Sequence, residues 1–195
     1  MKRPDPNVSI PAELERFYAS HSPVLLSVGG FEPEYEPLEQ IAAIKRIRED
    51  HPDAGLMILG GGSLKAEAEA AVRKLDHSES VMLAGNVEHG IALHLMERAD
   101  IMLRITKFDG DAISVREALF LGTPVIATNT GTRPVGVNLI NSSREEDLVE
   151  AVSSVPGKNG IQRGDDGSRN IREVLDLYDA LTTAMHERRV EAVAD

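Results

Sequence analysis

Residues 101–127 are "IMLRITKFDGDAISVREALFLGTPVIA", a stretch in which a helix stands between two short apolar runs. Residues 101–103 predict a buried strand, and the pattern over residues 113–121 predicts a helix. Gly122 directly after that helix is a typical stop signal, and residues 125–127 predict the next strand. The order strand, helix, strand is typical of neighbouring parallel strands joined by a crossover helix.

The same alternation runs through most of the chain. Other apolar runs predict strands at residues 24–28, 56–59, 81–84 and 137–140, and helical spacing predicts helices at residues 38–49, 63–75 and 90–98. The strands lack the polar–apolar alternation of a sheet with one wet face, so helices should cover both faces. We therefore predict an α/β fold: a single Rossmann-like, doubly wound parallel sheet of about six strands.

The chain divides into three parts on this interpretation. Residues 1–22 form an amino-terminal linker with a short helix at 12–19, and residues 23–155 form the sheet domain. Residues 156–195 hold a loop rich in glycine and aspartate, followed by a long C-terminal helix at 169–190. The apolar stripe of that helix should pack on this domain or on a missing partner.

Composition excludes several classes of protein. The formal net charge of −11 argues against nucleic acid as a partner, because a phosphate-backbone binder needs a concentrated positive face. The absence of cysteine excludes disulfides, a thiol nucleophile and Cys-ligated zinc. No apolar run approaches the roughly 20 residues of a transmembrane segment, and no signal peptide is recognisable. We expect a cytoplasmic protein without a transmembrane segment.

Glycines follow the predicted strands, at positions 29–30, 60–62, 85 and 110. Ligands of open parallel sheets bind outside the carboxyl ends of the strands, where these glycines should gather. The candidate site therefore lies at that edge. The six histidines show no metal-ligand spacing, and the glycines at 60–62 lack the rest of a dinucleotide-binding motif.

The Asp109-Gly110-Asp111 segment allows three interpretations. The two carboxylates could bind Mg²⁺ or Mn²⁺. They could be solvated acids at a helix start, where residues 114–117 match a capping box between Ser114 and Glu117. Alternatively, the backbone N–H groups that open the helix could bind phosphate, with nearby carboxylates accepting from sugar hydroxyls. A nucleotide sugar offers both kinds of group.

The motifs of this region resemble the donor half of retaining GT-B glycosyltransferases of the group 1 type. The similar segments, in order, are SVG at 27–29, LMILGGG at 56–62, VMLAGNV at 81–87, ADIML at 99–103, DG at 109–110, EAL at 117–119, GTPVIAT at 122–128 and Gly131. The resemblance covers roughly residues 23–155. The local form DGD-SVREAL looks like a variant within that family.

The resemblance implies a role for each matching residue. Asp109 would contact the transferred sugar as the catalytic-site acid, and Glu117 would accept from the ribose hydroxyls. The backbone from Gly110 through Asp111 to Ser114 would hold the diphosphate. The remaining substrate-binding positions would be Gly29 and Gly30, at the end of the first strand, and Asn86 and Val87, which would contact the base of the nucleotide. Such enzymes need no metal and no cofactor, the nucleotide sugar being a co-substrate.

Two departures from the family pattern concern charge. Gly30 and Tyr35 stand where the family has an arginine and a lysine that neutralise the diphosphate. Arg104 is our candidate substitute, with Arg116 and Arg133 as further cations, although Arg104 could equally be a surface arginine at a strand end. A third departure is Asp109, which replaces a longer glutamate.

The chain is therefore expected to be the nucleotide-sugar-binding domain of a hexosyltransferase-type enzyme in saccharide or cell-surface glycan synthesis. A GT-B enzyme binds its acceptor, a saccharide or lipid, mainly through an N-terminal half that this chain lacks. It would then be inactive alone. Two alternatives remain: a non-catalytic interaction module on the same half-fold, and a domain like that of a sugar-nucleotide epimerase.

Overall fold

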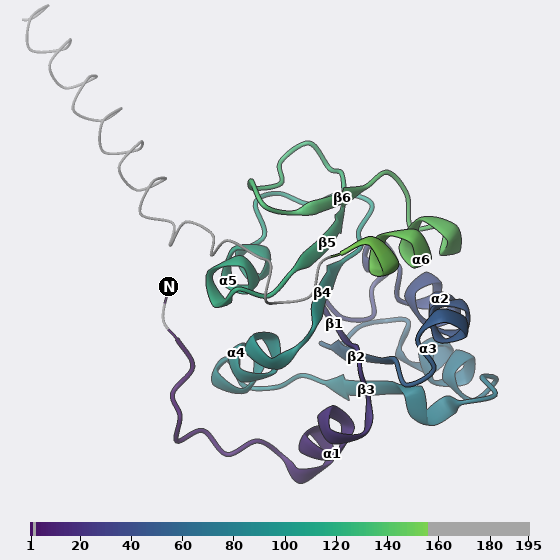
Figure 1. The fold of residues 1–195 in the computed structure, drawn as a ribbon, viewed down its shortest axis with the longest axis horizontal. Coiled ribbons are helices and arrows are strands. Elements are labelled where there is room, and N and C mark those ends of the chain that lie inside the picture. Colours follow the sequence, from purple (N-terminus) through teal and green to yellow (C-terminus); the bar gives the residue numbers. More distant parts are fainter. Residues whose placement is uncertain (2, 156–195) are drawn as a thin grey trace, which may run out of the picture. The chain divides into compact units, whose positions relative to one another are not determined.

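Six parallel strands form one sheet, in the order β3-β2-β1-β4-β5-β6 (Figure 1). The structure is a computed structural model and describes residue 1 and residues 3–155. The strands are β1 (Val24–Val28), β2 (Gly55–Leu59), β3 (Val81–Gly85), β4 (Ile101–Arg104), β5 (Val125–Thr128) and β6 (Asn138–Ile140). The predicted α/β fold with about six parallel strands is confirmed.

Strand order reverses at the centre of the sheet. β1 pairs with β2 on one side, where Leu26 lies opposite Met57, and with β4 on the other, where Leu26 lies opposite Met102. The chain therefore adds β2 and β3 on one side of β1, and then adds β4, β5 and β6 on its other side. Connections leave β1 and β4 on opposite sides, which opens a crevice at their carboxyl ends.

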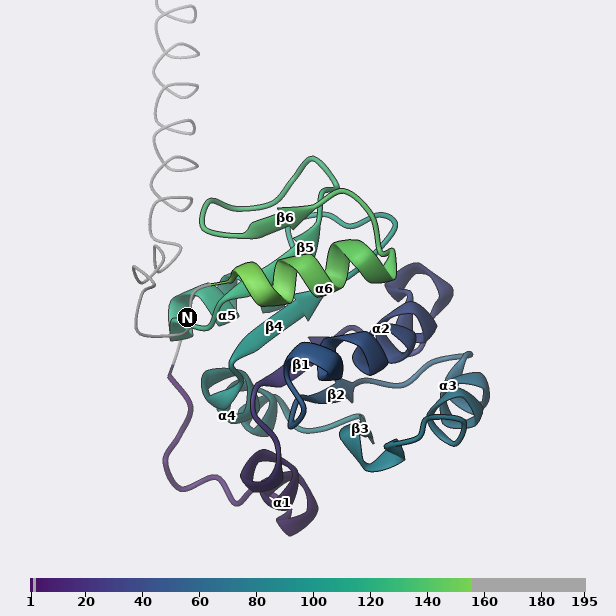
Figure 2. The ribbon, with the colours of Figure 1, turned by 45° about the vertical axis from the view of Figure 1, so that its right-hand side comes forward.

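Helices cover both faces of the sheet (Figure 2). Three of them pack against one face, since buried residues of α2 (Pro37–Asp50), α3 (Lys65–Val72) and α6 (Glu145–Ser154) share one core cluster. The others share a second cluster, with buried residues from α1 (Ala12–Ser20), α4 (His89–Arg98) and α5 (Ile113–Leu121). Two short 3₁₀ helices, η1 (Pro33–Tyr35) and η2 (Ser78–Ser80), lie in the connections.

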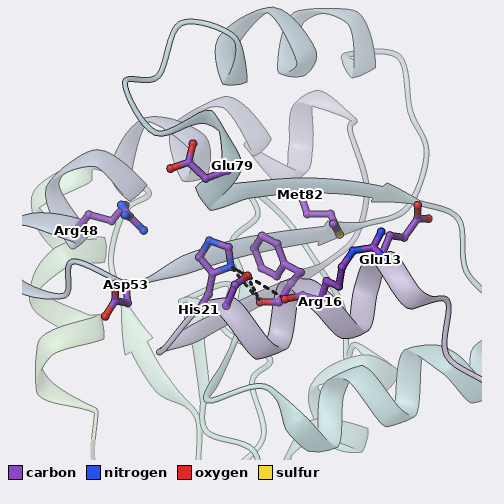
Figure 3. Close-up of a pocket in the computed structure, with 9 residues that line it drawn as sticks. Glu13, Arg16, His21, Arg48, Asp53, Glu79 and Met82 are labelled. Atoms are coloured by element: carbon purple, nitrogen blue, oxygen red, sulfur yellow. Dashed lines mark hydrogen bonds between the residues drawn. The ribbon is translucent and has the colours of Figure 1, made fainter.

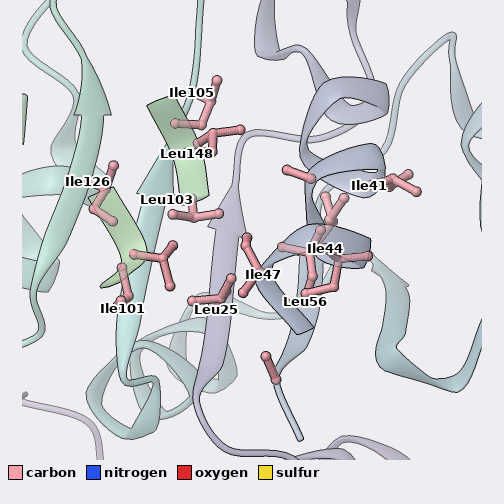
Figure 4. Close-up of a cluster of buried hydrophobic side chains, with 14 of the residues drawn as sticks. Leu25, Ile41, Ile44, Ile47, Leu56, Ile101, Leu103, Ile105, Ile126 and Leu148 are labelled. Carbon is pink, nitrogen blue, oxygen red and sulfur yellow. The ribbon is translucent and has the colours of Figure 1, made fainter. Parts of the chain in front are cut away.

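The strands supply alternate residues to the two cores. Leu25 faces the first cluster and its neighbour Leu26 faces the second, and both are fully buried. Figure 4 shows the first cluster, which includes Leu25 and Leu103 of the sheet, Ile47 of α2 and Leu148 of α6. Because both faces of the four central strands β1, β2, β4 and β5 are largely buried, their sequences are mostly apolar, as predicted, whereas the edge strands β3 and β6 are less buried.

Three details differ from the sequence prediction. The helix α6 was not predicted, although its buried residues Leu148, Ala151 and Val152 are at helical spacing. The helix α3 ends at Val72, before the predicted residue 75. The segment predicted as a linker contributes α1 to the second core cluster. The predicted helix at 169–190 and the loop before it lie outside the described residues.

None of the helices in the described part of the chain has the length and apolar character that crossing a membrane requires.

Candidate functional site

The loops after β1 and β2 meet at the carboxyl edge of the sheet. Gly30 has φ +100°, and a Cβ atom on it would lie 2.3 Å from the carbonyl oxygen of Gly61. Phe31 donates a backbone hydrogen bond of 2.9 Å to that same carbonyl. Any side chain at position 30 would push the two loops apart, so glycine is required there.

The loop after β3 joins the same edge. The N–H of Gly60 donates to the carbonyl of Gly85 at 2.8 Å, and the side chain of Asn86 lies against Gly61. Val87 packs on the second core cluster, while Asn86 is exposed. The structure thus brings Gly29, Gly30, Asn86 and Val87 to the edge where the sequence placed them.

The amino end of α5 is open. The helix begins at Ile113 after Ala112, which has no side chain able to cap it. The first backbone bond at this end runs from Val115 to the carbonyl of Ala112 at 3.1 Å. The N–H groups of Ile113 and Ser114 donate to no residue that the structure describes. Such a helix end favours an anion, through free donors and the helix dipole.

The predicted capping box at residues 114–117 is wrong. Ser114 lies inside the helix, at its second residue, so it cannot occupy the non-helical position that a cap requires. Glu117 has a different partner: its Oε1 atom lies 3.2 Å from Nε2 of His89, the first residue of α4. Glu117 is largely buried there, whereas His89 is exposed. His89 had no predicted role.

The two acids beside Gly110 have separate arginine partners. Asp111 is exposed, and both of its carboxylate oxygens accept from Nε of Arg116, at 2.7 and 2.8 Å. Asp111 is therefore an exposed, ion-paired acid that precedes the helix, and the first turn of α5 itself contains no acid. Asp109 pairs with two other arginines, Arg104 and Arg133. Within the residues described, no group of three or more His, Asp or Glu side chains could hold a metal ion.

Asp109 joins one arginine at the end of β4 and one in the loop after β5, and we refer to Arg104, Asp109 and Arg133 as the arginine cluster. Oδ2 of Asp109 accepts from Nε of Arg104 and from Nη1 of Arg133, both at 2.8 Å. The side chains of Arg104 and Asp109 are 11% and 13% exposed, and that of Arg133 is 2% exposed. Two cations and one anion leave the arginine cluster with a net charge of +1.

Arg104 crosses from β4 to the end of β1. Its Nη1 donates to the carbonyl of Val28 at 2.6 Å, and its guanidinium lies 4.8 Å from the centre of the Tyr35 ring. Gly29 leaves room for this arrangement, since a Cβ atom there would lie 3.2 Å from Nη1. The alternative that Arg104 is a surface arginine is wrong, because its side chain is largely buried.

The charges of the arginine cluster affect Asp109 directly. Partial burial by itself would raise the pKa of the Asp109 carboxyl group. The hydrogen bonds and positive charges of Arg104 and Arg133 outweigh that effect and hold the pKa below its ordinary value. Asp109 is therefore a carboxylate at neutral pH, and the ion pairs of the arginine cluster are present there.

Arg133 is the member of the arginine cluster for which the sequence pattern provides the weakest support. It follows β5 in a loop, and its Nε donates to the carbonyl of Thr128 at 3.1 Å. Its Nη2 atom is buried and has no hydrogen-bond partner among the described residues. Its position after the strand predicted at residues 125–127 was the only signal for it in the sequence.

A separate cavity of about 380 Å³ lies beside α1 (Figure 3). It is lined by acids and bases in nearly equal number, among them Glu13, Asp53, Arg16 and Arg48. Asp53 precedes β2, which places this cavity toward the amino ends of the strands. It is therefore distinct from the glycine-rich edge.

The fold and the site together define a doubly wound α/β domain of the Rossmann type, with its polar groups and an open helix end gathered at the carboxyl edge of the sheet. The chain belongs to the family described as "Glycosyl transferases group 1", which it matches over residues 15–154. The matched range includes the arginine cluster, the start of α5 and Glu117.

Two curated relatives support the same family. The chain is 31% identical over 107 residues to a protein named glycogen synthase from Mycobacterium tuberculosis, and this region is 55% of the chain and 26% of the relative. It is 29% identical over 111 residues to an uncharacterized glycosyltransferase from Methanocaldococcus jannaschii, covering 57% and 27%. The matched regions thus span about a quarter of these relatives.

Solved structures share the fold. The HepE protein of Anabaena, solved with UDP-glucose, superposes with a TM-score of 0.62 at 15% identity, covering 75% of this chain and 43% of that one. The C-terminal domain of LpcC, a group 1 glycosyl transferase from Francisella tularensis, gives a TM-score of 0.62 at 14% identity. This match covers 77% of this chain and 83% of that domain.

Proposed function

We propose that this chain is the domain of a glycosyltransferase that binds the nucleotide-sugar donor. The observation that carries the proposal is the open amino end of α5, at the carboxyl edge of the sheet, where the N–H groups of Ile113 and Ser114 have no acceptor among residues 1 and 3–155. Free N–H groups at such a helix end suit the oxygen atoms of a diphosphate. Membership of the group 1 family and the UDP-glucose bound to HepE agree with this ligand class.

Glu117 is the residue that we assign to the ribose. Its carboxylate is largely buried, and its only described partner is the exposed side chain of His89 at 3.2 Å. An ionised carboxylate is a pure acceptor, so it can take hydrogen bonds from two neighbouring hydroxyl groups. His89 can turn into solvent when a ribose occupies its place, because its side chain is exposed.

The binding site of the acceptor substrate is proposed only from the membership of the chain in this family. An acceptor saccharide or lipid would bind mainly to a second, N-terminal domain. Two large apolar side chains, Phe108 and Ile113, are exposed on the loop and helix start beside the arginine cluster. They would form part of the surface that faces this second domain. Retention of anomeric configuration, independence of metals and cofactors, and a cytoplasmic location stay predictions from the sequence.

The test is thermal denaturation of the 195-residue chain with UDP, GDP, ADP and their glucose conjugates. A ligand at 100 times its Kd adds about 2.7 kcal/mol to the free energy of unfolding. For a domain of this size, that raises Tm by about 5–10 °C. We expect one base series to produce this rise, and no rise with any compound would contradict the proposal and favour a non-catalytic interaction module.

Two matched variants locate the response. Glu117→Gln keeps the shape of the side chain but replaces one acceptor oxygen with an amide, so it should remove most of the rise in Tm. Glu150→Ala changes an exposed glutamate of α6 and should respond like wild type. If Glu117→Gln also responds like wild type, the assignment of Glu117 to the ribose is wrong.

A further inference from the structure

The arginine cluster contains an unsatisfied donor. Nη2 of Arg133 is buried and has no hydrogen-bond partner among the residues that the structure describes, although Nε and Nη1 of the same side chain are both bonded. A buried N–H group without an acceptor destabilises the folded protein, because it loses its hydrogen bond to water and gains none in return. In native proteins such a group calls for a specific explanation, and a ligand that supplies the acceptor is one.

The position of the arginine cluster indicates where that ligand comes from. Arg104 is the last residue of β4 and donates to Val28, the last residue of β1. The carboxyl ends of these two strands flank the point where the strand order reverses, which is where open α/β sheets bind ligands. The arginine cluster therefore stands inside the expected crevice.

The charge and shape of the arginine cluster indicate which group it binds. It carries a net charge of +1, within a chain whose formal net charge is −11. Guanidinium groups present paired N–H donors that match phosphate oxygens. Hydrogen bonds to Val28, Asp109 and Thr128, and the ring of Tyr35, already fix the two guanidinium groups. Such groups lose little further freedom when an anion binds.

Access requires only a local movement. The loop that carries Arg133 is exposed on both sides of it, at Thr132 and at Val135. Thr132 Oγ1 donates to the carbonyl of Asp109 at 3.2 Å, a long bond that is readily exchanged. An outward shift of this loop would expose the buried Nη2 atom to a ligand.

We infer that Arg104 and Arg133 bind the diphosphate of the nucleotide donor, and that Asp109 is the positioning residue that holds the two guanidinium groups together. This inference rests on the proposed function and adds two side chains to the amides of α5. It also explains how the site neutralises a diphosphate although positions 30 and 35 are glycine and tyrosine.

The experiment is isothermal titration of the 195-residue chain with UDP, GDP and ADP, and with inorganic pyrophosphate, which carries the diphosphate without a base. Arg133→Gln and Arg104→Gln should each weaken binding of the preferred nucleoside diphosphate and of pyrophosphate at least tenfold. Arg133→Lys keeps the positive charge but lacks the paired N–H donors of the guanidinium group, so it should reduce affinity by an intermediate factor. Arg46→Gln, an exposed arginine of α2 paired with Glu145, is the matched control and should bind like wild type.

Asp109→Asn separates a role in binding from a role in folding alone. It leaves both cations in place and keeps one acceptor oxygen to position them, so the variant should weaken binding of the nucleoside diphosphate less than Arg133→Gln does. Equal weakening in Asp109→Asn and Arg133→Gln would show a purely structural cluster and overturn the inference.

The remaining outcomes are also decisive. Tight binding of a nucleoside diphosphate by wild type, Arg104→Gln and Arg133→Gln alike would overturn this inference and leave the proposed function intact. If wild type binds none of the nucleoside diphosphates, the proposed function fails, and the inference fails with it.

Discussion

Thr128, the last residue of β5, and Thr106, just after β4, exchange two hydrogen bonds through one side chain. Oγ1 of Thr128 accepts from the N–H of Thr106 at 2.9 Å and donates to the carbonyl of Thr106 at 2.6 Å. Both residues are buried. This pair links the start of the loop that carries Asp109 to the start of the loop that carries Arg133. It therefore helps to hold the two loops of the arginine cluster together.

Thr128→Val should therefore destabilise the domain. The valine keeps the shape of the side chain but leaves a buried N–H and a buried carbonyl of Thr106 unpaired, which should cost about 2 kcal/mol or more. Thr132→Val, an exposed position in the same loop, should change stability by no more than about 0.5 kcal/mol. Urea denaturation of both variants measures the difference, and equal midpoints would show that the two buried hydrogen bonds contribute nothing.

Asp109→Asn should alter the pH dependence of stability. Because the pKa of Asp109 is lowered in the folded state, its ion pairs stabilise the protein above the ordinary aspartate pKa of about 3.9. That stabilisation is lost as the pH falls through the lowered folded-state value. The variant should be about 2 kcal/mol less stable than wild type at pH 7, since it leaves two largely buried arginines without a counter-ion.

The difference between the two proteins should shrink as the pH falls below 4. Urea denaturation at intervals between pH 7 and pH 3 measures it. A difference that stays constant over this range would mean that Asp109 does not titrate with a lowered pKa.

Gly30→Ala should lower the stability of the domain, whereas Gly110→Ala should mainly weaken ligand binding. Gly30 has φ +100° and touches Gly61, so alanine there should cost at least about 2 kcal/mol. A Cβ atom on Gly110 would meet nothing within 4 Å, and stability should change by less than about 1 kcal/mol. The new methyl group would instead stand where the diphosphate approaches, weakening the binding of UDP or its counterpart about three- to tenfold.

Thermal denaturation and titration of both variants provide the comparison. A Gly30→Ala protein as stable as wild type would contradict the close contact between the two loops. A Gly110→Ala protein that binds like wild type would place the diphosphate elsewhere.

Phe17→Ala should show that the amino-terminal segment belongs to the domain. Phe17 is 4% exposed and belongs to the second core cluster, although sequence analysis assigned residues 1–22 to a linker. Loss of such a side chain costs about 3–5 kcal/mol. Phe108→Ala, at an exposed phenylalanine, is the control and should cost less than about 0.5 kcal/mol. Equal denaturation midpoints would restore the linker assignment.

The fold was predictable because the central strands are buried on both faces of the sheet and are therefore mostly apolar. The run at residues 24–28 is apolar except for Ser27, and the structure gives β1 those same limits. The glycine edge was predictable as well, because left-handed backbone and close loop contact leave few alternatives to glycine. The start of α5 at Ile113 followed from its apolar spacing.

The partners of the site residues were not predictable to the same extent. Ser114 and Glu117 matched a capping box by spacing, but such a box needs the helix to begin at residue 115, and the helix begins two residues earlier, at Ile113. The contact between Arg133 and Asp109 depends on how the loops after β4 and β5 fold toward each other. No local periodicity records such a contact, so the arginine cluster emerged only from the structure.

The proposed binding of a nucleotide sugar depends most on the open amino end of α5. Amide NMR of the ¹⁵N-labelled chain observes this helix end directly. During titration with UDP, GDP or ADP, whichever binds, the amide signals of Ile113 and Ser114 should shift more than those of the helices on the opposite face, such as α6. If the nucleotide binds while these two amide signals stay in place, the diphosphate does not occupy this helix end. That result would contradict the proposal that the amides of Ile113 and Ser114 bind it.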